Sequence, residues 1–190
     1  MGKVTVIIVN GVSRSGKDTF IDHLAKKTQL LIKHSTIDTV KQALINAKMC
    51  DYRKKGKEER EFLALVKQAW IAYNNGPLKE VINKVDRLEK QYKFIYHIEK
   101  IFLTVQVREI TEIMKLKDHF EEDLVSLLVV RDSVDPQHES DEYVEYWDYN
   151  FTVSNNGSLE QLESQVDSFL TFLNGDIVIG KRYYYGRNIV

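Results

Sequence analysis

A glycine-rich stretch near the N-terminus constrains the fold of this chain more than any other feature. The preceding segment, Val4–Val9, consists of β-branched residues only, which is typical of a buried strand. It leads into Gly11-x4-Gly16-Lys17, and a helical pattern begins near Gly16. Strand, glycine-rich turn and helix in this order predict a parallel sheet whose ligands bind beyond the carboxyl ends of its strands.

The residue types of this turn suit the binding of phosphate groups. Glycines allow positive φ angles, so that backbone N–H groups can close around phosphate oxygens, and the following helix contributes its positive end. Lys17 would place its charge on the β- and γ-phosphates. A plain glycine-rich turn with an exposed lysine is the alternative, and a solvated charge is as good an interpretation of Arg14. We predict an ATP site formed by Gly11, Ser13, Arg14, Ser15, Gly16, Lys17, Asp18 and Thr19.

The residue after the lysine departs from the usual motif, which has a serine or threonine there to ligate Mg²⁺. This chain has Asp18, followed by Thr19. A carboxylate is a good ligand for hard cations. Our hypothesis is that Asp18 binds Mg²⁺, directly or through water; the alternative is that it only caps the helix.

The rest of the chain alternates between strand and helix patterns. Apolar runs predict further strands at 30–34, 101–107, 124–130 and 150–154. Signals for helix starts lie between them: Ser35 or Thr36 as a cap, Pro77 at a first position, and a Ser158–Gln161 capping box that opens a helix with Leu159 facing inward. This alternation predicts a three-layer α/β fold with about five parallel strands.

Composition narrows the classes of protein further. The chain has 190 residues, enough for one domain, and a formal net charge of -1, which argues against a nucleic-acid binder. A single cysteine, Cys50, excludes an intrachain disulfide, and the apolar N-terminal run is too short for a signal peptide or a membrane span. We expect a cytoplasmic protein without a membrane partner.

The Gly-Lys-Asp-Thr form of the motif resembles that of the phage-type deoxynucleoside monophosphate kinases, a family of P-loop NTPases. The similarity runs from the first strand to about Leu173 and is diffuse between Pro77 and Lys100. Other segments that resemble the family are Ser35–Lys41, Arg60-Glu61-Phe62-Leu63 with Trp70 downstream, Arg108-Glu109, His138-x-Ser140, Asp148, and Val153–Leu162.

This resemblance implies an architecture and an activity. One P-loop kinase domain would comprise a core (1–34, 100–130 and 150–174), a helical monophosphate-binding insertion (35–99) and a lid (131–149). The activity would be transfer of the γ-phosphoryl group of ATP, with Mg²⁺, to a (deoxy)nucleoside monophosphate. The tail, 175–190, falls outside the resemblance; its basic and aromatic residues suggest an added strand or a homodimer contact rather than nucleic-acid binding.

Arginines suit phosphoryl transfer because their planar fork binds phosphate in a bidentate way. Arg108 directly follows a buried strand on the expected ligand side, and Arg131 follows another. A surface charge at Arg60 and an ordinary helix cap at Asp38 stay open as alternatives. The predicted catalytic residues are Lys17, Arg108 and Arg131, and the predicted acceptor-binding residues are Asp38, Lys41, Arg60 and Arg108.

Two features depart from the pattern of these kinases. The third predicted strand ends Thr104-Val105-Gln106-Val107-Arg108, without the acidic residue that holds the metal in many P-loop enzymes. The lid segment is acidic, and Arg131 alone leads it. A kinase for another small phosphate, such as phosphomevalonate, and an ATP-binding sensor with weak turnover therefore stand as alternative functions.

Overall fold

The computed structural model describes residues 3–49, 56–95, 98–134, 143–175 and 184–185. Cys50, His138, Ser140 and most of the tail lie outside these ranges. Among the described residues, one parallel sheet has the strand order β2-β3-β1-β4-β5-β6. The strands are β1 (Lys3–Asn10), β2 (Leu31–Ser35), β3 (Lys100–Gln106), β4 (Leu124–Val130), β5 (Phe151–Ser154) and β6 (Tyr184–Tyr185).

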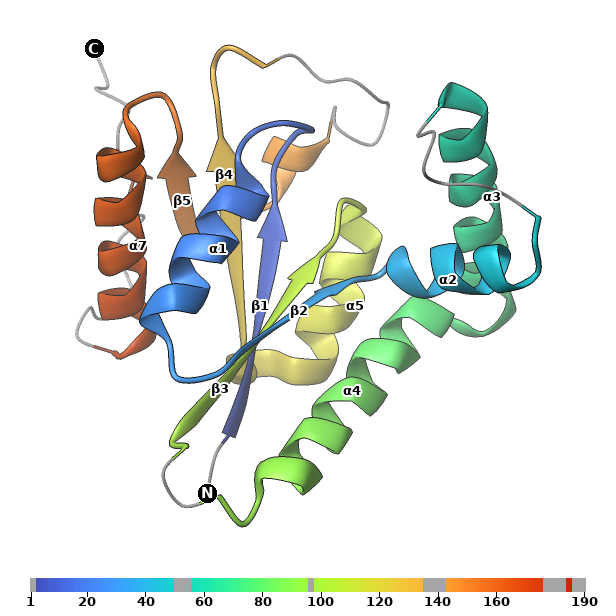
Figure 1. Ribbon diagram of the computed structural model, residues 1–190, viewed down its shortest axis with the longest axis horizontal. Coiled ribbons are helices and arrows are strands. Elements are labelled where there is room, and N and C mark those ends of the chain that lie inside the picture. The colour runs from blue at the N-terminus through green and yellow to red at the C-terminus, as the bar shows by residue number, and fades with distance from the viewer. Residues whose placement is uncertain (1–2, 50–55, 96–97, 135–142, 176–183, 186–190) are drawn as a thin grey trace.

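Helices cover both faces of the sheet (Figure 1). The helices α4 and α5 pack on one face and α1 and α7 on the other, while α2 and α3 extend beyond the β2 edge. A small separate core of Val40, Leu44 and Leu63 joins α2 to α3. The helices are α1 (Lys17–Lys27), α2 (Asp38–Asn46), α3 (Lys57–Asn74), α4 (Gly76–Tyr92), α5 (Ile110–Phe120) and α7 (Leu159–Leu173), with 3-10 turns η1 (Glu121–Asp123) and η2 (Val144–Tyr146). No helix of the described residues has the length and apolarity to cross a membrane.

The central strand explains why the N-terminal run is β-branched throughout. Successive side chains of a strand point to opposite faces. Val6 and Ile8 of β1 enter the core under α4 and α5, and Ile7 and Val9 enter the core under α1 and α7. All four are fully buried, so this part of β1 is covered on both faces.

The predicted fold class is confirmed. A parallel sheet, in the order 2-3-1-4-5 for its first five strands, lies between helical layers. The capping box between Ser158 and Gln161 is also present. The added strand suggested for the tail is β6, which pairs with β5.

Two local expectations were wrong. Leu159 is 53% exposed, because it is the first residue of α7 and precedes Leu162, the first residue of that helix in the core. The cap of α2 is neither Ser35 nor Thr36. Ser35 belongs to β2 and Thr36 is buried, so that the helix starts after Ile37 without a side-chain cap.

Candidate functional site: a phosphate loop at the carboxyl edge of the sheet

The loop between β1 and α1 leaves the central strand at the carboxyl edge of the sheet (Figure 1). Its two glycines have left-handed φ angles, 145° at Gly11 and 98° at Gly16. A Cβ on Gly11 would collide with the carbonyl of Val129, and one on Gly16 with the side-chain amide of Asn155. Glycine is therefore required at both positions by conformation and by space.

Asn155 braces this loop from the turn after β5. Its Nδ2 donates to the carbonyl oxygen of Ser15 at 2.8 Å, and its own N–H donates to the carbonyl of Val130 at 2.8 Å. The sequence analysis included Asn155 only within the segment Val153–Leu162. Its place directly after a strand, on the ligand side, was the signal for a role in the site.

The interior of the loop suits an anion. Lys17 Nζ donates to the carbonyl oxygens of Gly11 at 2.5 Å and Val12 at 2.7 Å, so the ammonium group lies over the loop. The hydroxyl of Ser15 is fully buried and has no hydrogen-bond partner within the described part of the chain. Arg14 is exposed at the tip, with a φ of 66°. A positive charge, an orphaned hydroxyl and a helix N-terminus together fit a phosphate group.

A carboxylate does lie at the end of β3, although the sequence of that strand has none. Gln106, the last residue of β3, donates Nε2 to Oδ1 of Asp18 at 2.6 Å. Since β3 pairs with β1, the first turn of α1 supplies the acid to the place where a strand-end acid would stand. Sequence reasoning missed Gln106, although its position at a strand end pointed to the site.

These residues fit Mg²⁺ bound together with a nucleotide. Mg²⁺ prefers oxygen ligands and usually takes one or two carboxylates plus substrate phosphates. Asp18 has an exposed carboxylate beside the loop, and Thr19 follows it. The described residues contain no group of three or more His, Cys, Asp or Glu side chains arranged for a metal, and a phosphate-bound Mg²⁺ requires none.

A second polar connection ties the loop to a distant segment. Asn10, only 1% exposed, accepts the N–H of Gly11 on Oδ1 at 2.8 Å and donates Nδ2 to the hydroxyl of Tyr149 at 2.7 Å. The same Nδ2 lies 3.5 Å from the carbonyl oxygen of Arg108. Nothing in the sequence pattern pointed to Asn10 or Tyr149, because their contact spans 139 positions.

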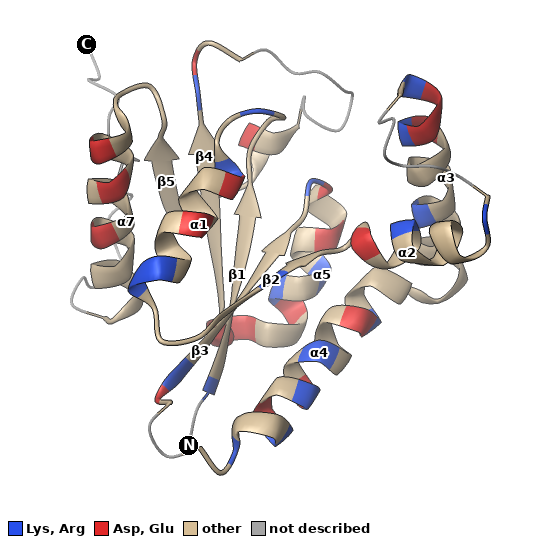
Figure 2. Ribbon diagram, viewed as in Figure 1, with Lys and Arg blue, Asp and Glu red and all other residues tan. Residues whose placement is uncertain are grey.

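The predicted acceptor residues are spread over two helices and the segment after β3. Asp38 and Lys41 form an ion pair of 3.1 Å with each other at the start of α2, and no described contact links them to the loop. Arg60 is exposed near the start of α3. Charged residues gather at this end of α3, which Figure 2 shows at about the same height in the view as the phosphate loop. Arg108 is half-buried after β3, and Arg131 is exposed after β4. Strand ends thus bring Arg108 and Arg131 to the edge that carries the loop.

Buried charges join the helical insertion to the core. Lys67 of α3 and Glu112 of α5 form an ion pair of 2.5 Å, with side chains only 11% and 8% exposed. Burial raises the pKa of Glu112, and Lys67 opposes that shift. A small cavity adjoins Glu112 and is lined by Thr36, Ile71, Asn75, Pro77, Leu78, Glu112, Lys115 and Leu116.

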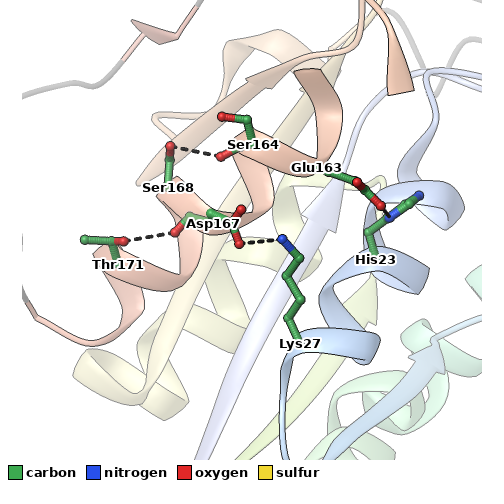
Figure 3. Close-up of polar contacts among 7 residues, drawn as sticks. All are labelled: His23, Lys27, Glu163, Ser164, Asp167, Ser168 and Thr171. Carbon is green, nitrogen blue, oxygen red and sulfur yellow. Dashed lines mark hydrogen bonds and ion pairs between the residues drawn. The ribbon is translucent and has the colours of Figure 1, made fainter. Parts of the chain in front are cut away.

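Polar side-chain contacts join α1, the helix that follows the loop, to α7. His23 Nδ1 lies 2.7 Å from Glu163 Oε1, and Lys27 Nζ lies 2.6 Å from Asp167 Oδ1 (Figure 3). Beneath them, Phe20 packs edge-on against Phe169. These contacts fix α1, and with it the backbone groups at the end of the phosphate loop.

No protein-family model and no curated protein matches this chain. Among solved structures it is similar to shikimate kinase from Acinetobacter baumannii in complex with shikimate (11% identity, 91% of this chain, 94% of that chain, TM-score 0.46). It is also similar to thymidylate kinase from Candida albicans (12%, 95% and 96%, 0.45) and to a sugar kinase from a Janibacter species (15%, 92% and 95%, 0.45). Similarities this low identify neither an activity nor a substrate.

Proposed function

We propose that this chain is an ATP-dependent kinase that phosphorylates a (deoxy)nucleoside monophosphate to the diphosphate. The observation that carries the proposal is the pairing of Asp18 with Gln106 at 2.6 Å beside a glycine loop that carries Lys17. A loop that only bound phosphate would need the lysine and the backbone groups. A carboxylate held beside them adds a ligand for the metal that accompanies ATP in phosphoryl transfer.

The donor side of the reaction uses the loop and the first turn of α1. Backbone N–H groups and Lys17 would bind the β- and γ-phosphates, and Ser15 would offer its buried hydroxyl to a phosphate oxygen. Asp18 and Thr19 would hold Mg²⁺, which when bound neutralises charge on the phosphate oxygens. Gln106 keeps the carboxylate of Asp18 at the end of β3 by donating to one of its oxygens.

The acceptor side uses arginines. An oxygen of the acceptor monophosphate attacks the γ-phosphorus, the bond from that phosphorus to the β,γ-bridging oxygen breaks, and ADP leaves with the electron pair. No general base is needed, because the acceptor phosphate is already ionised at neutral pH. Arg108 and Arg60 would orient the acceptor, with Lys41 and Asp38 at the start of α2, and Arg131 would stabilise charge from the lid side.

Mg²⁺-dependent ADP production from ATP, measured across all common ribo- and deoxyribonucleoside monophosphates, tests this function. Lys17→Ala is the blank. We expect turnover that requires one or a few monophosphates and disappears in Lys17→Ala. ATP binding without acceptor-dependent turnover on this panel would contradict the proposal and favour a sensor or a kinase for a non-nucleotide phosphate.

A further inference from the structure

The hydrogen bonds around Asn10 have only one consistent direction. A backbone carbonyl can only accept, so the single proton of the Tyr149 hydroxyl points to the carbonyl oxygen of Val144, 2.7 Å away. The hydroxyl oxygen must then accept from Asn10, which places the NH₂ group of Asn10 toward Tyr149. The amide oxygen of Asn10 is left facing the N–H of Gly11. The hydroxyl of Tyr149 thus sets which way Asn10 points.

Packing holds the side chain of Tyr149 in place. Its ring packs against the cluster of Leu128, Val130 and Val144, and Val144 is fully buried. Burial raises the pKa of the Tyr149 hydroxyl, so it stays protonated and keeps donating throughout the neutral range.

A second anchor lies beside Tyr149 in the chain. Ser126 of β4 accepts the indole N–H of Trp147 at 3.3 Å and the backbone N–H of Asn150 at 3.2 Å on its hydroxyl oxygen. Its own N–H donates to the side chain of Asn150 at 2.9 Å. The segment 143–150, the C-terminal part of the predicted lid together with the residue after it, is therefore fastened to the sheet on both sides of Tyr149.

We propose that Tyr149 and Asn10 are positioning residues. Their hydrogen bonds, from Tyr149 to Asn10 and from Asn10 to Gly11, form a relay that holds the start of the phosphate loop in a fixed position relative to the backbone of Arg108, which follows β3. The relay has one end at Gly11, on the ATP side, and passes within 3.5 Å of the backbone of Arg108, on the acceptor side. Its catalytic part rests on the proposed kinase function. In-line transfer demands that donor and acceptor be held to a fraction of an ångström, so a looser relay lowers the rate more than the affinity.

Tyr149→Phe tests the relay directly, because it removes one oxygen and leaves the ring in place. Hydrogen exchange followed by mass spectrometry needs no turnover. We expect about tenfold faster exchange in the peptide that covers residues 10–16, the effect of one lost buried hydrogen bond, and unchanged exchange in α4 and α7. With the best acceptor found, kcat should fall about tenfold, while the Kd for ATP, measured by titration, changes less than about threefold.

Tyr146→Phe is the matched control, because Tyr146 lies in the same segment but is 78% exposed. It should change neither exchange nor kcat. Asn10→Asp is the second variant, in case Tyr149→Phe fails to fold: a carboxylate cannot donate to Tyr149, so the same peptide should exchange faster. Combining the two changes should add little, since both break one relay.

The outcomes separate this proposal from the proposed function. Wild-type exchange in the 10–16 peptide of Tyr149→Phe would overturn the relay, whatever the activity. A wild-type protein without acceptor-dependent turnover would contradict the kinase function, and the relay would then be judged by exchange alone. Faster exchange with an unchanged kcat would refute the positioning role and leave a purely structural hydrogen bond.

Discussion

Gly16 has a conformation that other residues adopt only under strain, and the space above it is already filled by Asn155. Gly16→Ala combines both penalties. We expect ATP affinity to fall at least about tenfold, because the added methyl group displaces either the side chain of Asn155 or the loop itself. A nucleotide titration measures this affinity. Gly175→Ala is the matched control: its φ of 81° is also left-handed, but no atom lies within 4 Å of the added Cβ. Equal ATP affinity in the two variants would contradict this account of Gly16.

The charge state of His34 should affect the free energy of unfolding. It is buried on β2, and its Nε2 has no hydrogen-bond partner in the described structure. Burial lowers the pKa of His34, and the positive charge of Lys84 lowers it further. Arg87 acts in the same direction, whereas Glu80 and Asp38 oppose it. The folded protein therefore keeps His34 neutral to a lower pH than the unfolded chain does.

The sign of the pH dependence follows from this shift. Between about pH 6.5 and the lower pKa of His34 in the folded state, the unfolded chain binds more protons at His34 than the folded chain, so the free energy of unfolding falls as the pH falls through this window, by up to about 1.4 kcal/mol per pH unit. His34→Gln should remove this contribution and flatten the profile. Urea unfolding from about pH 7.5 down to about pH 5 measures both proteins, and equal slopes would show that His34 is not responsible.

At the scale of elements, the link between α3 and α5 depends on a buried ion pair. Lys67→Met leaves the carboxylate of Glu112 buried without its partner, which should cost about 3 kcal/mol in the free energy of unfolding. Replacing both residues, as Lys67→Met with Glu112→Leu, should cost clearly less because no lone charge is left. Urea denaturation measures both, and the reverse order of stabilities would contradict this role of the pair.

The ion pair between α1 and α7 offers a matched comparison. Lys27 and Asp167 are 2.6 Å apart, close to the 2.5 Å of the buried pair, but their side chains are 34% and 61% exposed (Figure 3). Asp167→Asn should therefore cost only about 0.5 kcal/mol. A loss as large as that of Lys67→Met would mean that burial is not what distinguishes the two pairs.

Elements were easier to predict from the sequence than their contacts. The strand β4 begins and ends where its mostly apolar run does, because a strand covered on both faces is built mainly of apolar residues. The hydrogen bond between Asp18 and Gln106, by contrast, joins residues 88 positions apart. Taken alone, each residue departs from the usual pattern. Asp18 is an acid where a hydroxyl is usual, and Gln106 is an amide where an acid is usual. Only the pairing of β3 with β1 brings the two departures together.

At the scale of the whole molecule, the topology assembles the site from three distant stretches of chain. The first strand lies in the middle of the sheet, with β3 on one side and β4 on the other. All strands are parallel, so the phosphate loop, Gln106, Arg108 and Arg131 reach the same edge. Each of these residues follows or ends a strand. The loop, Arg108 and Arg131 were predicted as site residues from the sequence, whereas Gln106 was missed and no distance could be predicted.

The site exists only in the folded chain, so ligand binding at the site should raise the stability of the whole molecule. A ligand that binds only the folded chain raises the melting temperature. We expect ATP to raise that of the wild type, and Mg²⁺ to add a further increment. Asp18→Asn should keep the rise caused by ATP alone and lose most of the Mg²⁺ increment, because the amide is a far weaker ligand than the carboxylate.

Asp22→Asn is the control for that experiment. It makes the same change one turn further along α1, where Asp22 pairs with Lys33 on the surface away from the loop. It should lower the melting temperature slightly and leave the Mg²⁺ increment intact. If Asp18→Asn and Asp22→Asn respond to Mg²⁺ alike, Asp18 is not the metal ligand. Its bond to Gln106 then only fastens α1 to β3, and the metal in any phosphoryl transfer must be held by ATP and other groups.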